Sequence, residues 1–277
     1  MPRARIHRKA EFESSHFMRV PTWSEAENER AFGRLTRPHG HNYVVEAGVE
    51  GPIDKKNFWV VNIKDLDDAM RDWVVEPLDH KCLNLDVPFF RDRNPTCENL
   101  ALYVWQALDG KVGNCTLCRT AAKEYDWLGA SYFGEIIGGL PMARLTRTYE
   151  FSAVHRLHRP ELSDEENEAI FGKCSWPNGH GHSYRAEIAI SGPIHAETGM
   201  VFDLALLDRI VQAEVIDRLD FKNLNEEVPE LKGQIPTTEV LARFIYQAVK
   251  PHIAAPAALK RTRIYETHKS WFDYEEE

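Results

Sequence analysis

The feature that most limits how this chain can fold is an internal duplication. His16 closes the segment "EFESSH", and 139 positions later His155 closes the segment "EFSAVH". Three further pairs of segments repeat at an offset of 141 positions: "HGHNY" and "HGHSY", "PLDHKCLN" and "RLDFKNLN", "PTCENLALYVWQAL" and "PTTEVLARFIYQAV". Chance does not keep three pairs of segments at one offset and a fourth pair within two residues of it. The chain is therefore predicted to be a tandem repeat of one structural unit.

The join between the two copies is predicted in "GEIIGGLPMAR", residues 134–144, where glycines and a proline interrupt regular structure. We expect a first repeat over residues 1–137 and a second over residues 143–277. The 277 residues are enough to bury one large core or two modest ones, so length alone leaves both arrangements open.

Each copy predicts the same order of elements: strand, strand, helix, helix, strand, strand. A Gly-Pro turn closes the second strand of each copy. Asn62 and Asp203 are predicted to cap the first helix of their repeats, and the second helix starts at Thr96 or Thr237. In each repeat this order predicts an α+β layer, an antiparallel four-stranded sheet with both helices on one face.

Composition restricts the partners and the location of the protein. The formal net charge of −9 argues against nucleic acid as the main partner, although local basic residues can still bind a phosphorylated small molecule. Apolar runs are short and interrupted by charges, so no membrane partner is expected. The five cysteines are odd in number and sparse, which predicts reduced thiols in a cytoplasm.

Each repeat carries three histidines that could meet at one point. Two of them lie two residues apart on a predicted strand and therefore point to the same face, while the third ends the strand expected alongside. Three imidazoles without a fourth protein ligand describe an open zinc site, with room for water or substrate. Ordinary hydrogen-bonded histidines are the alternative for one short motif, but the repetition of all three favours metal. The candidate zinc ligands are His16, His39 and His41 in the first repeat and His155, His180 and His182 in the second.

Cys174 stands six residues before the histidine pair of the second repeat. A single cysteine is usually a buried structural thiol. Here Lys173, a turn-rich "SWPNG" loop and a nearby cation would all favour the thiolate, so a catalytic base is the competing interpretation.

Asp79 and His80 follow the end of a predicted helix in "PLDHKCLN". The pair could serve as a helix cap. A histidine held by an aspartate can equally relay a proton to or from a thiol. The residues alone leave these two interpretations about even.

Together these motifs resemble the 6-pyruvoyl-tetrahydropterin synthase family, which includes the bacterial 6-carboxytetrahydropterin synthases. The resemblance covers nearly the whole chain as two copies. Its most specific segments are "LSDEENEAIFGKCSWPNGHGHSY", "PLDHKCLNLDVPFF" and "IYETH". It implies two tandem tunnelling-fold repeats, zinc held by the three histidines of each repeat, and action on 7,8-dihydroneopterin triphosphate with elimination of triphosphate.

The resemblance also implies roles for particular residues. Cys174 matches the family's cysteine base, and Asp79 with His80 matches its Asp-His pair. Glu266 in "YET" matches the glutamate that anchors the pterin, and Glu124 in "KEY" is a weaker counterpart. Further substrate contacts are expected from Thr238 and Glu239 in "PTTE". For the triphosphate, Lys173 and Arg185 are only candidates.

The sequence departs from the family pattern in a paired way. The first repeat keeps Asp79 and His80 but has Leu35 in place of the cysteine, whereas the second keeps Cys174 but has Phe221 in place of the histidine. Family sites lie between subunits, so the resemblance implies one active site shared by the two repeats. It also implies a homo-oligomer, with six tunnelling-fold units supplied by three chains. A ring of three units cannot alternate two kinds, so we expect stacked rings of like halves or another ring size.

Three functions remain open from the sequence. The leading one is a lyase that forms 6-pyruvoyl-tetrahydropterin, because the spacing in "FGKCSWPNGHGH" looks more like that type. The second is a 6-carboxytetrahydropterin synthase that feeds deazapurine (queuosine) synthesis. The third, from another class, is a zinc-containing pterin-binding protein without turnover.

Overall fold

The computed structural model describes residues 2–276 of the chain, and these form two compact units. Unit 1 contains the chain up to Thr146 together with Ser191–Val201, and unit 2 contains Arg147–Ile190 and the chain from Phe202 onward. The units therefore do not follow the two copies in the sequence, because an eleven-residue segment of the second copy packs within unit 1. No helix among the described residues is both long and apolar enough to cross a membrane.

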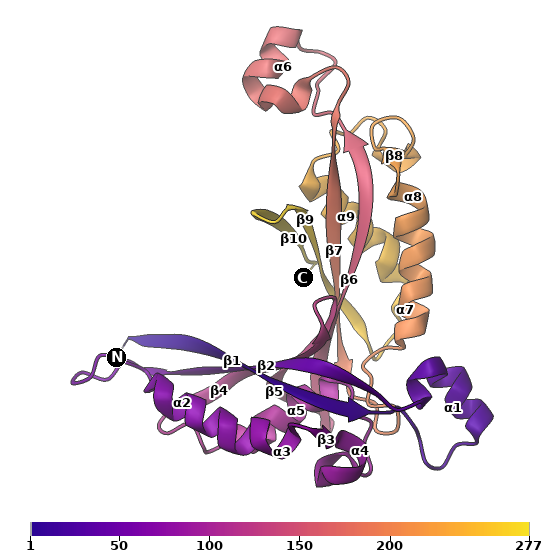
Figure 1. Cartoon of the computed structure of the whole chain (residues 1–277). Coiled ribbons are helices and arrows are strands. Elements are labelled where there is room, and N and C mark those ends of the chain that lie inside the picture. Colours follow the sequence, from indigo (N-terminus) through magenta and orange to yellow (C-terminus); the bar gives the residue numbers. More distant parts are fainter. Residues whose placement is uncertain (1, 277) are drawn as a thin grey trace. The chain divides into compact units, whose positions relative to one another are not determined.

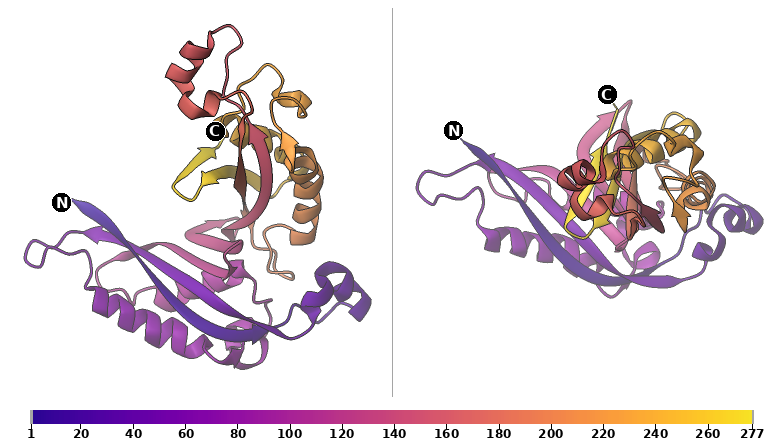
Figure 2. Two further views of the ribbon diagram at one scale, coloured as in Figure 1. Left: turned by 45° about the horizontal axis from the view of Figure 1, so that its top comes forward. Right: turned by 90° about the horizontal axis from the view of Figure 1, so that it is seen from above.

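Unit 1 is built on the long strands β1 and β2, which pair antiparallel along their whole length. Both views in Figure 2 show these strands side by side. The elements that begin in this unit are β1 (Arg3–His16), α1 (Glu25–Phe32), β2 (His39–Pro52), α2 (Ile63–Met70), α3 (Glu76–Leu78), β3 (Lys81–Cys82), α4 (Leu83–Asp86), α5 (Cys97–Leu108), β4 (Thr116–Tyr125), β5 (Leu128–Ile137) and β6 (Leu140–His155). A π-helical turn, Arg71–Val75, joins α2 to α3, so the first predicted helix is one continuous helix.

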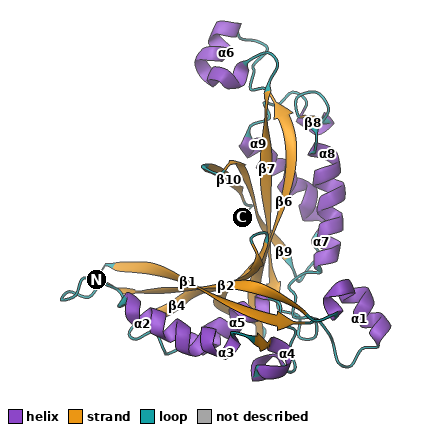
Figure 3. Cartoon of the chain, viewed as in Figure 1, coloured by secondary structure: helices purple, strands orange, loops and turns teal. Residues whose placement is uncertain are grey.

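Unit 2 repeats this plan. Its elements are α6 (Asp164–Phe171), β7 (His180–Pro193), α7 (Leu204–Val211), α8 (Asp217–Leu219), β8 (Lys222–Asn223), α9 (Thr238–Val249), β9 (Ala258–Thr267) and β10 (Ser270–Tyr274), and β6 continues into it from unit 1. A π-helical turn, Gln212–Ile216, again joins the two parts of the first helix. Figure 3 shows α7 and α8 as parts of one helix.

The sheets are mixed and larger than the four antiparallel strands that the sequence predicted. In unit 1, β2 pairs antiparallel with β1 and β4, and β4 pairs antiparallel with β5. The two-residue strand β3 adds a parallel edge to β1, and β8 does the same for β6 in unit 2. These extra strands form because the chain that leaves the first helix folds back along the first strand of its repeat. The α+β class is confirmed, but the simple four-stranded sheet is not.

One face of each sheet carries the core. Tyr43, Val45, Ala47 and Val49 alternate along β2 and are fully buried, as the two-residue period of a strand requires. Their counterparts on β7, Tyr184 to Ile190, repeat the pattern. Figure 1 shows α2 and α3 running along one side of β1 and β2. The predicted caps are confirmed: the side chains of Asn62, Thr96, Asp203 and Thr237 each accept a hydrogen bond from a backbone N–H in the first turn of a helix.

The segment of the second copy in unit 1 is fixed by hydrogen bonds to the start of α5. The Thr96 hydroxyl donates to the carbonyl of Gly199 over 2.7 Å, and the Val201 N–H donates to the buried carboxylate of Glu98 over 3.0 Å. The Asn94 amide donates to the carbonyl of Glu197 over 3.0 Å. We call residues 195–201 the second-repeat turn.

Gly199 is the residue of this turn that tolerates least change. Its φ of +76° lies in the left-handed region, and a Cβ there would stand 2.6 Å from Asn99 Nδ2. We expect Gly199→Ala to lower the free energy of unfolding by about 3 kcal/mol, combining about 1–2 kcal/mol of left-handed strain with overpacking. Urea denaturation measures this loss.

Gly138 provides the matched control for that substitution. Its φ is +60°, but nothing lies within 4 Å of the position that a Cβ would take. Gly138→Ala should therefore lose only the strain of about 1–2 kcal/mol. Equal losses for the two variants would contradict the close packing inferred at Gly199.

Candidate functional site

Strand register brings three histidines together in each repeat. His16, at the end of β1, lies directly opposite His39 at the start of β2, and His41 follows two residues later on the same face. Because alternate residues of a strand share a face, the pairing aims all three imidazoles at one point. The ligand atoms of each triad lie within 4.8 Å of one another.

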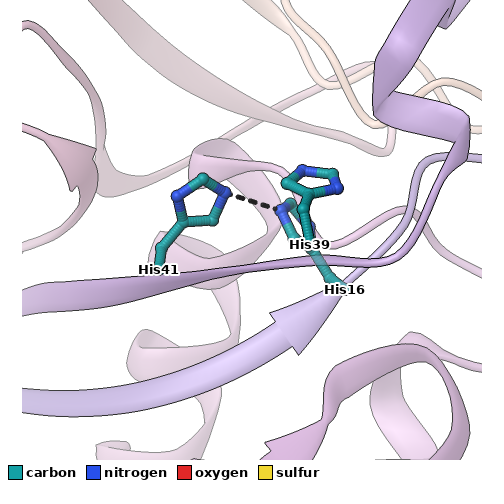
Figure 4. Close-up of side chains that lie close together, drawn as sticks. All are labelled: His16, His39 and His41. Carbon is teal, nitrogen blue, oxygen red and sulfur yellow. Dashed lines mark hydrogen bonds between the residues drawn. The ribbon is translucent and has the colours of Figure 1, made fainter.

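The first triad is shown in Figure 4. His16 Nε2 and His41 Nε2 are 3.1 Å apart, and the His16 and His39 rings have centroids separated by 4.3 Å. His39 Nδ1 lies 2.7 Å from the carbonyl oxygen of Arg37, which orients that ring. Burial, followed by the neighbouring imidazoles, lowers the pKa of His16 to about 3 and that of His41 to about 4.

The second triad repeats this geometry. His155 Nε2 and His180 Nε2 are 3.2 Å apart, and the His155 and His182 ring centroids are 5.2 Å apart. His155 Nδ1 lies 2.8 Å from the carbonyl oxygen of Pro236, which leaves Nε2 directed at the other rings. Burial lowers the pKa of His155 and of His182. Neutral imidazoles are the form that binds a metal.

Both triads fit a metal ion. His39 Nε2 and His182 Nε2 are buried and make no hydrogen bond. The Nε2 separations of 3.1 and 3.2 Å approach the edge of about 3.3 Å in a tetrahedron whose metal–nitrogen bonds are about 2.0–2.1 Å. A buried nitrogen without a partner is unfavourable, and a shared cation would satisfy it. Each triad can therefore hold a metal ion.

A glutamate lies beside each triad. Glu266, on β9, has an oxygen 3.6 Å from His155 Nε2 and 3.4 Å from His182 Nε2. Glu124, on β4, has an oxygen 3.8 Å from His16 Nε2, and burial followed by the charge of Glu98 raises its pKa to about 8. The two carboxylates occupy matching positions, but Glu124 is the more deeply buried, with 12% of its side chain exposed against 24% for Glu266.

Cys174 lies half-buried in the 3₁₀ turn Gly172–Ser175. Its backbone carbonyl accepts a hydrogen bond from Leu157 N–H over 2.9 Å. Burial, followed by the charges of Glu266 and Cys174, raises the pKa of Tyr184, the tyrosine that follows the histidine pair. The Tyr184 hydroxyl is 3.5 Å from His155 Nδ1. The structure thus places Glu266 and Tyr184 beside the second triad in unit 2.

Leu35 occupies the position of Cys174 in the first repeat, in the same 3₁₀ turn and with the same backbone hydrogen bond, here to Met18 N–H over 2.8 Å. Its side chain packs against a buried apolar cluster of Met18, Val20 and Phe32, which Met200 also contacts. The cysteine position of the first repeat is therefore part of an apolar core and carries no polar group.

Asp79 and His80 lie in unit 1, where a strand backbone holds them. The Asp79 carboxylate accepts from Glu13 N–H over 2.9 Å and lies 2.8 Å from His80 Nδ1. The carboxylate raises the pKa of His80, whose side chain is 75% exposed and whose φ is +56°. Asp79 is the C-cap residue of α3, but its carboxylate bonds the Glu13 N–H and His80 and not a group of the helix.

Phe221 takes the place of His80 in unit 2 without a change of backbone. Its φ is +55°, its N–H donates to the Ser152 carbonyl, and Asp220 accepts from Ser152 N–H over 2.8 Å. The phenyl ring is 85% exposed. An exposed aromatic ring at a left-handed position is unusual. The matching position of unit 1 holds an exposed histidine, His80, with nearly the same φ.

Thr238 and Glu239 form the first turn of α9, after the cap residue Thr237. Thr238 is buried and Glu239 is exposed. This turn lies close to the second triad, because the Pro236 carbonyl just before it contacts His155. Of the two triphosphate candidates, Arg185 lies over the ring of Tyr265 and Lys173 lies near the ring of Trp176.

Several residues beside the site were not predicted from the sequence. Tyr43 and Tyr184 stand on the same strand face as the histidines, and the alternation in "HGHNY" and "HGHSY" was the signal for them. A hollow beside His155 is lined in part by Arg156, His158 and Arg159, and no local pattern indicated it.

Comparisons with known proteins show which proteins this chain is similar to. A family model described as 6-pyruvoyl tetrahydropterin synthase matches residues 5–135 and again residues 144–277. A 6-pyruvoyl tetrahydrobiopterin synthase of Drosophila melanogaster is 42% identical over 48% of this chain and 80% of its own length. A 6-carboxy-5,6,7,8-tetrahydropterin synthase of Haemophilus influenzae is 26% identical over 49% of this chain and all of its own. The solved Caenorhabditis elegans 6-pyruvoyl tetrahydropterin synthase is 37% identical over 50% of this chain and 98% of its own, with a TM-score of 0.47.

Proposed function

Because the chain belongs to the 6-pyruvoyl tetrahydropterin synthase family, we propose that it is a zinc-dependent carbon–oxygen lyase. The reaction converts 7,8-dihydroneopterin triphosphate to 6-pyruvoyl-tetrahydropterin with elimination of triphosphate. The observation that carries this proposal is the arrangement in unit 2, where Glu266 lies 3.4 Å from His182 Nε2 and 3.6 Å from His155 Nε2, beside the three imidazoles of the second triad.

Zinc is the metal that suits the triads best. Three imidazole nitrogens with no thiolate and no bidentate carboxylate among the closest ligands match a catalytic zinc site with an open position. His155, His180 and His182 would hold the ion in the second repeat, and His16, His39 and His41 would hold one in the first. When bound, zinc polarises oxygens of the substrate side chain and acidifies the adjacent C–H.

Proton transfer falls to two groups from different repeats. Cys174, as a thiolate, removes the acidified proton of the substrate. His80 returns protons during elimination and tautomerisation. Its raised pKa suits this role, because Asp79 favours the protonated ring near neutral pH. Neither repeat has both groups, so the active site is shared between repeats.

The pterin ring is bound through its polar edge. The Glu266 carboxylate accepts hydrogen bonds from the amino and ring N–H groups, a paired contact that selects for this edge. Thr238 and Glu239, near His155, add contacts to the substrate. Glu124 has the matching position in the first repeat, but its raised pKa makes it a poorer acceptor at neutral pH.

The repeats over residues 1–137 and 143–277 would assemble into a homo-oligomer, for which six tunnelling-fold units from three chains is the family's usual number. A cytoplasmic location agrees with five free cysteines. The similarity to a 6-carboxytetrahydropterin synthase supports a second candidate, the 6-carboxy product.

We expect the purified protein to convert 7,8-dihydroneopterin triphosphate to a 6-pyruvoyl product and triphosphate without releasing acetaldehyde. Chromatography of the pterins, with a separate assay for acetaldehyde, measures both reactions. Acetaldehyde in step with substrate loss would favour the 6-carboxy reaction. No turnover by metal-replete protein would leave a pterin-binding protein.

Two matched variants identify the repeat in which turnover occurs. Glu266→Gln removes the charged acceptor beside the second triad and should lower kcat/KM by roughly 10²-fold, corresponding to about 2–3 kcal/mol of lost charge-assisted binding. Glu124→Gln makes the same change beside the first triad and should leave turnover near the wild-type value. The reverse result would place catalysis in the first repeat.

A further inference from the structure

The second-repeat turn, residues 195–201, has a counterpart in the first repeat that is not docked. At the offset of 141, His195 corresponds to Asp54, Gly199 to Phe58 and Val201 to Val60. We call residues 54–60 the first-repeat turn.

The two turns have the same backbone conformation. In the second-repeat turn, His195 N–H donates to the Met200 carbonyl over 3.1 Å, and Gly199 N–H donates to the His195 carbonyl over 2.8 Å. In the first-repeat turn, Asp54 N–H donates to the Trp59 carbonyl, and Phe58 N–H to the Asp54 carbonyl, both over 2.9 Å. The φ of Phe58, +61°, is close to the +76° of Gly199.

Their surroundings differ completely. Gly199 and Val201 are buried against α5, whereas Phe58 is 81% exposed and Trp59 is 46% exposed. A bulky residue at a left-handed position is strained, and such strain persists where it serves a function. The first-repeat turn thus presents an exposed phenyl ring on a backbone already shaped for docking.

The surface that binds the second-repeat turn, at the start of α5, also has a counterpart in the second repeat. Thr96 and Glu98, whose side chains bond that turn, correspond to Thr237 and Glu239 on α9. Glu98 is buried, but Glu239 is exposed and makes no hydrogen bond or ion pair within residues 2–276. The start of α9 therefore carries the same bonding groups with no turn on them.

The side chains that contact the fifth residue of each turn differ between the repeats in step with that residue. A Cβ on Gly199 would stand 2.6 Å from Asn99 Nδ2 and 3.1 Å from the Asn94 carbonyl oxygen. Asn94 and Asn99 correspond to Ile235 and Val240, both half-buried. Glycine thus packs against two asparagines, and its phenylalanine counterpart has two aliphatic residues at the matching positions. The apolar pair suits a buried phenyl ring.

We propose that the first-repeat turn of one chain docks on the start of α9 of a second copy of this chain. Phe58 lies between Ile235 and Val240, while Val60 N–H donates to Glu239 as Val201 N–H donates to Glu98. The partner's turn then lies beside the second triad, because Pro236 contacts His155. The inference stands on the contacts of the second-repeat turn in unit 1 and on the matching residues of α9 in unit 2, and it does not depend on the proposed reaction.

This pairing decides the order of repeats in the assembly. Phe58 cannot take the place of Gly199 against Asn94 and Asn99, where even a Cβ collides. First repeats therefore do not dock on one another. Each chain makes one such contact internally and one with the next chain, and a head-to-tail contact of this kind forms a ring when the rotation between neighbouring chains closes. The ring alternates the two repeats and contains whole chains.

The proposal is tested with two variants, one that disables the first-repeat turn and one that disables the receiving surface on α9. The quantity measured is the mass of the assembly in solution. Phe58→Asp leaves the left-handed backbone unstrained, since aspartate tolerates that region, but removes the phenyl ring. Val240→Asp puts a charge on the receiving surface. Light scattering should show the wild type as an oligomer and each variant as a single chain of 31.9 kDa. An equimolar mixture of the variants should form a dimer and nothing larger, because only one intact turn and one intact surface remain to pair.

The control is Ile170→Asp on α6, which changes an exposed aliphatic residue outside both surfaces and should keep the wild-type mass. Circular dichroism checks that each variant is folded, and Ile235→Asp replaces Val240→Asp if that variant is not. A monomeric wild type, a Phe58→Asp oligomer of wild-type mass, or a mixture that stays monomeric would each overturn the proposal.

Discussion

Replacing either Cys174 or His80 with alanine should abolish turnover, although the two residues belong to different repeats. Each variant loses a group that moves a proton in the reaction, and such groups contribute roughly 10²–10⁴-fold to a rate. We expect kcat to fall by roughly 10³-fold in each variant, with little change in substrate affinity, since neither group is the pterin anchor. Steady-state kinetics on metal-replete protein measures both parameters.

Controls for this experiment lie in the same chain. Cys82→Ala removes another half-buried thiol, and His252→Ala removes another exposed histidine that is paired with a carboxylate. Both should keep near wild-type turnover.

Mixing the two inactive variants, Cys174→Ala and His80→Ala, then shows whether the site forms within one chain or between chains. Sites between chains should recover about a quarter of the activity, by the statistics of independent partners, and sites within one chain should recover none. Near-normal turnover by His80→Ala would refute the shared site.

The second large effect concerns the metal. We expect up to two zinc ions per chain, because both triads have the same geometry. His180→Ala should remove one ion and nearly all activity, since three imidazoles are the whole protein ligand set of an open site. His39→Ala is its counterpart in the first repeat and should remove one ion while most turnover remains. Mass spectrometry of elements gives the metal content of the same samples used for kinetics.

The result that would count against the metal proposal is equally clear. Freshly purified protein without metal, or His180→Ala with an unchanged metal content, would mean that the second triad does not hold an ion. Loss of activity in His39→Ala equal to that in His180→Ala would mean that the two triads contribute alike.

Local signals in the sequence predicted much of the fold. Asn62 and Thr96 show why: a cap depends on one side chain and the next three residues, so the pattern is complete within a short window. The histidine triads were predictable for a related reason. His39 and His41 obey the period of a strand, and the duplication supplied a second example of the same arrangement.

Long-range contacts were not predictable in the same way. The two-residue strand β3 depends on where the chain folds back along β1, and two residues carry no period. The docking of Gly199 on Thr96 joins residues about a hundred positions apart. Nothing near Gly199 in the sequence specifies that contact. Asn94 and Asn99 differ from their aliphatic counterparts in the second repeat, but this difference can be interpreted only once the structure shows the contact.

The packing of Leu35 makes the loss of the cysteine from the first repeat hard to reverse. In the second repeat the matching turn keeps a half-buried thiol, but Leu35 contacts the apolar cluster that includes Met18 and Met200. A return to cysteine would empty part of that cluster, at roughly 1–2 kcal/mol, and would gain no proton carrier while Phe221 remains. Restoring the missing groups therefore requires two simultaneous substitutions, one at Leu35 and one at Phe221. Evolution by single substitutions is therefore expected to keep the two repeats specialised.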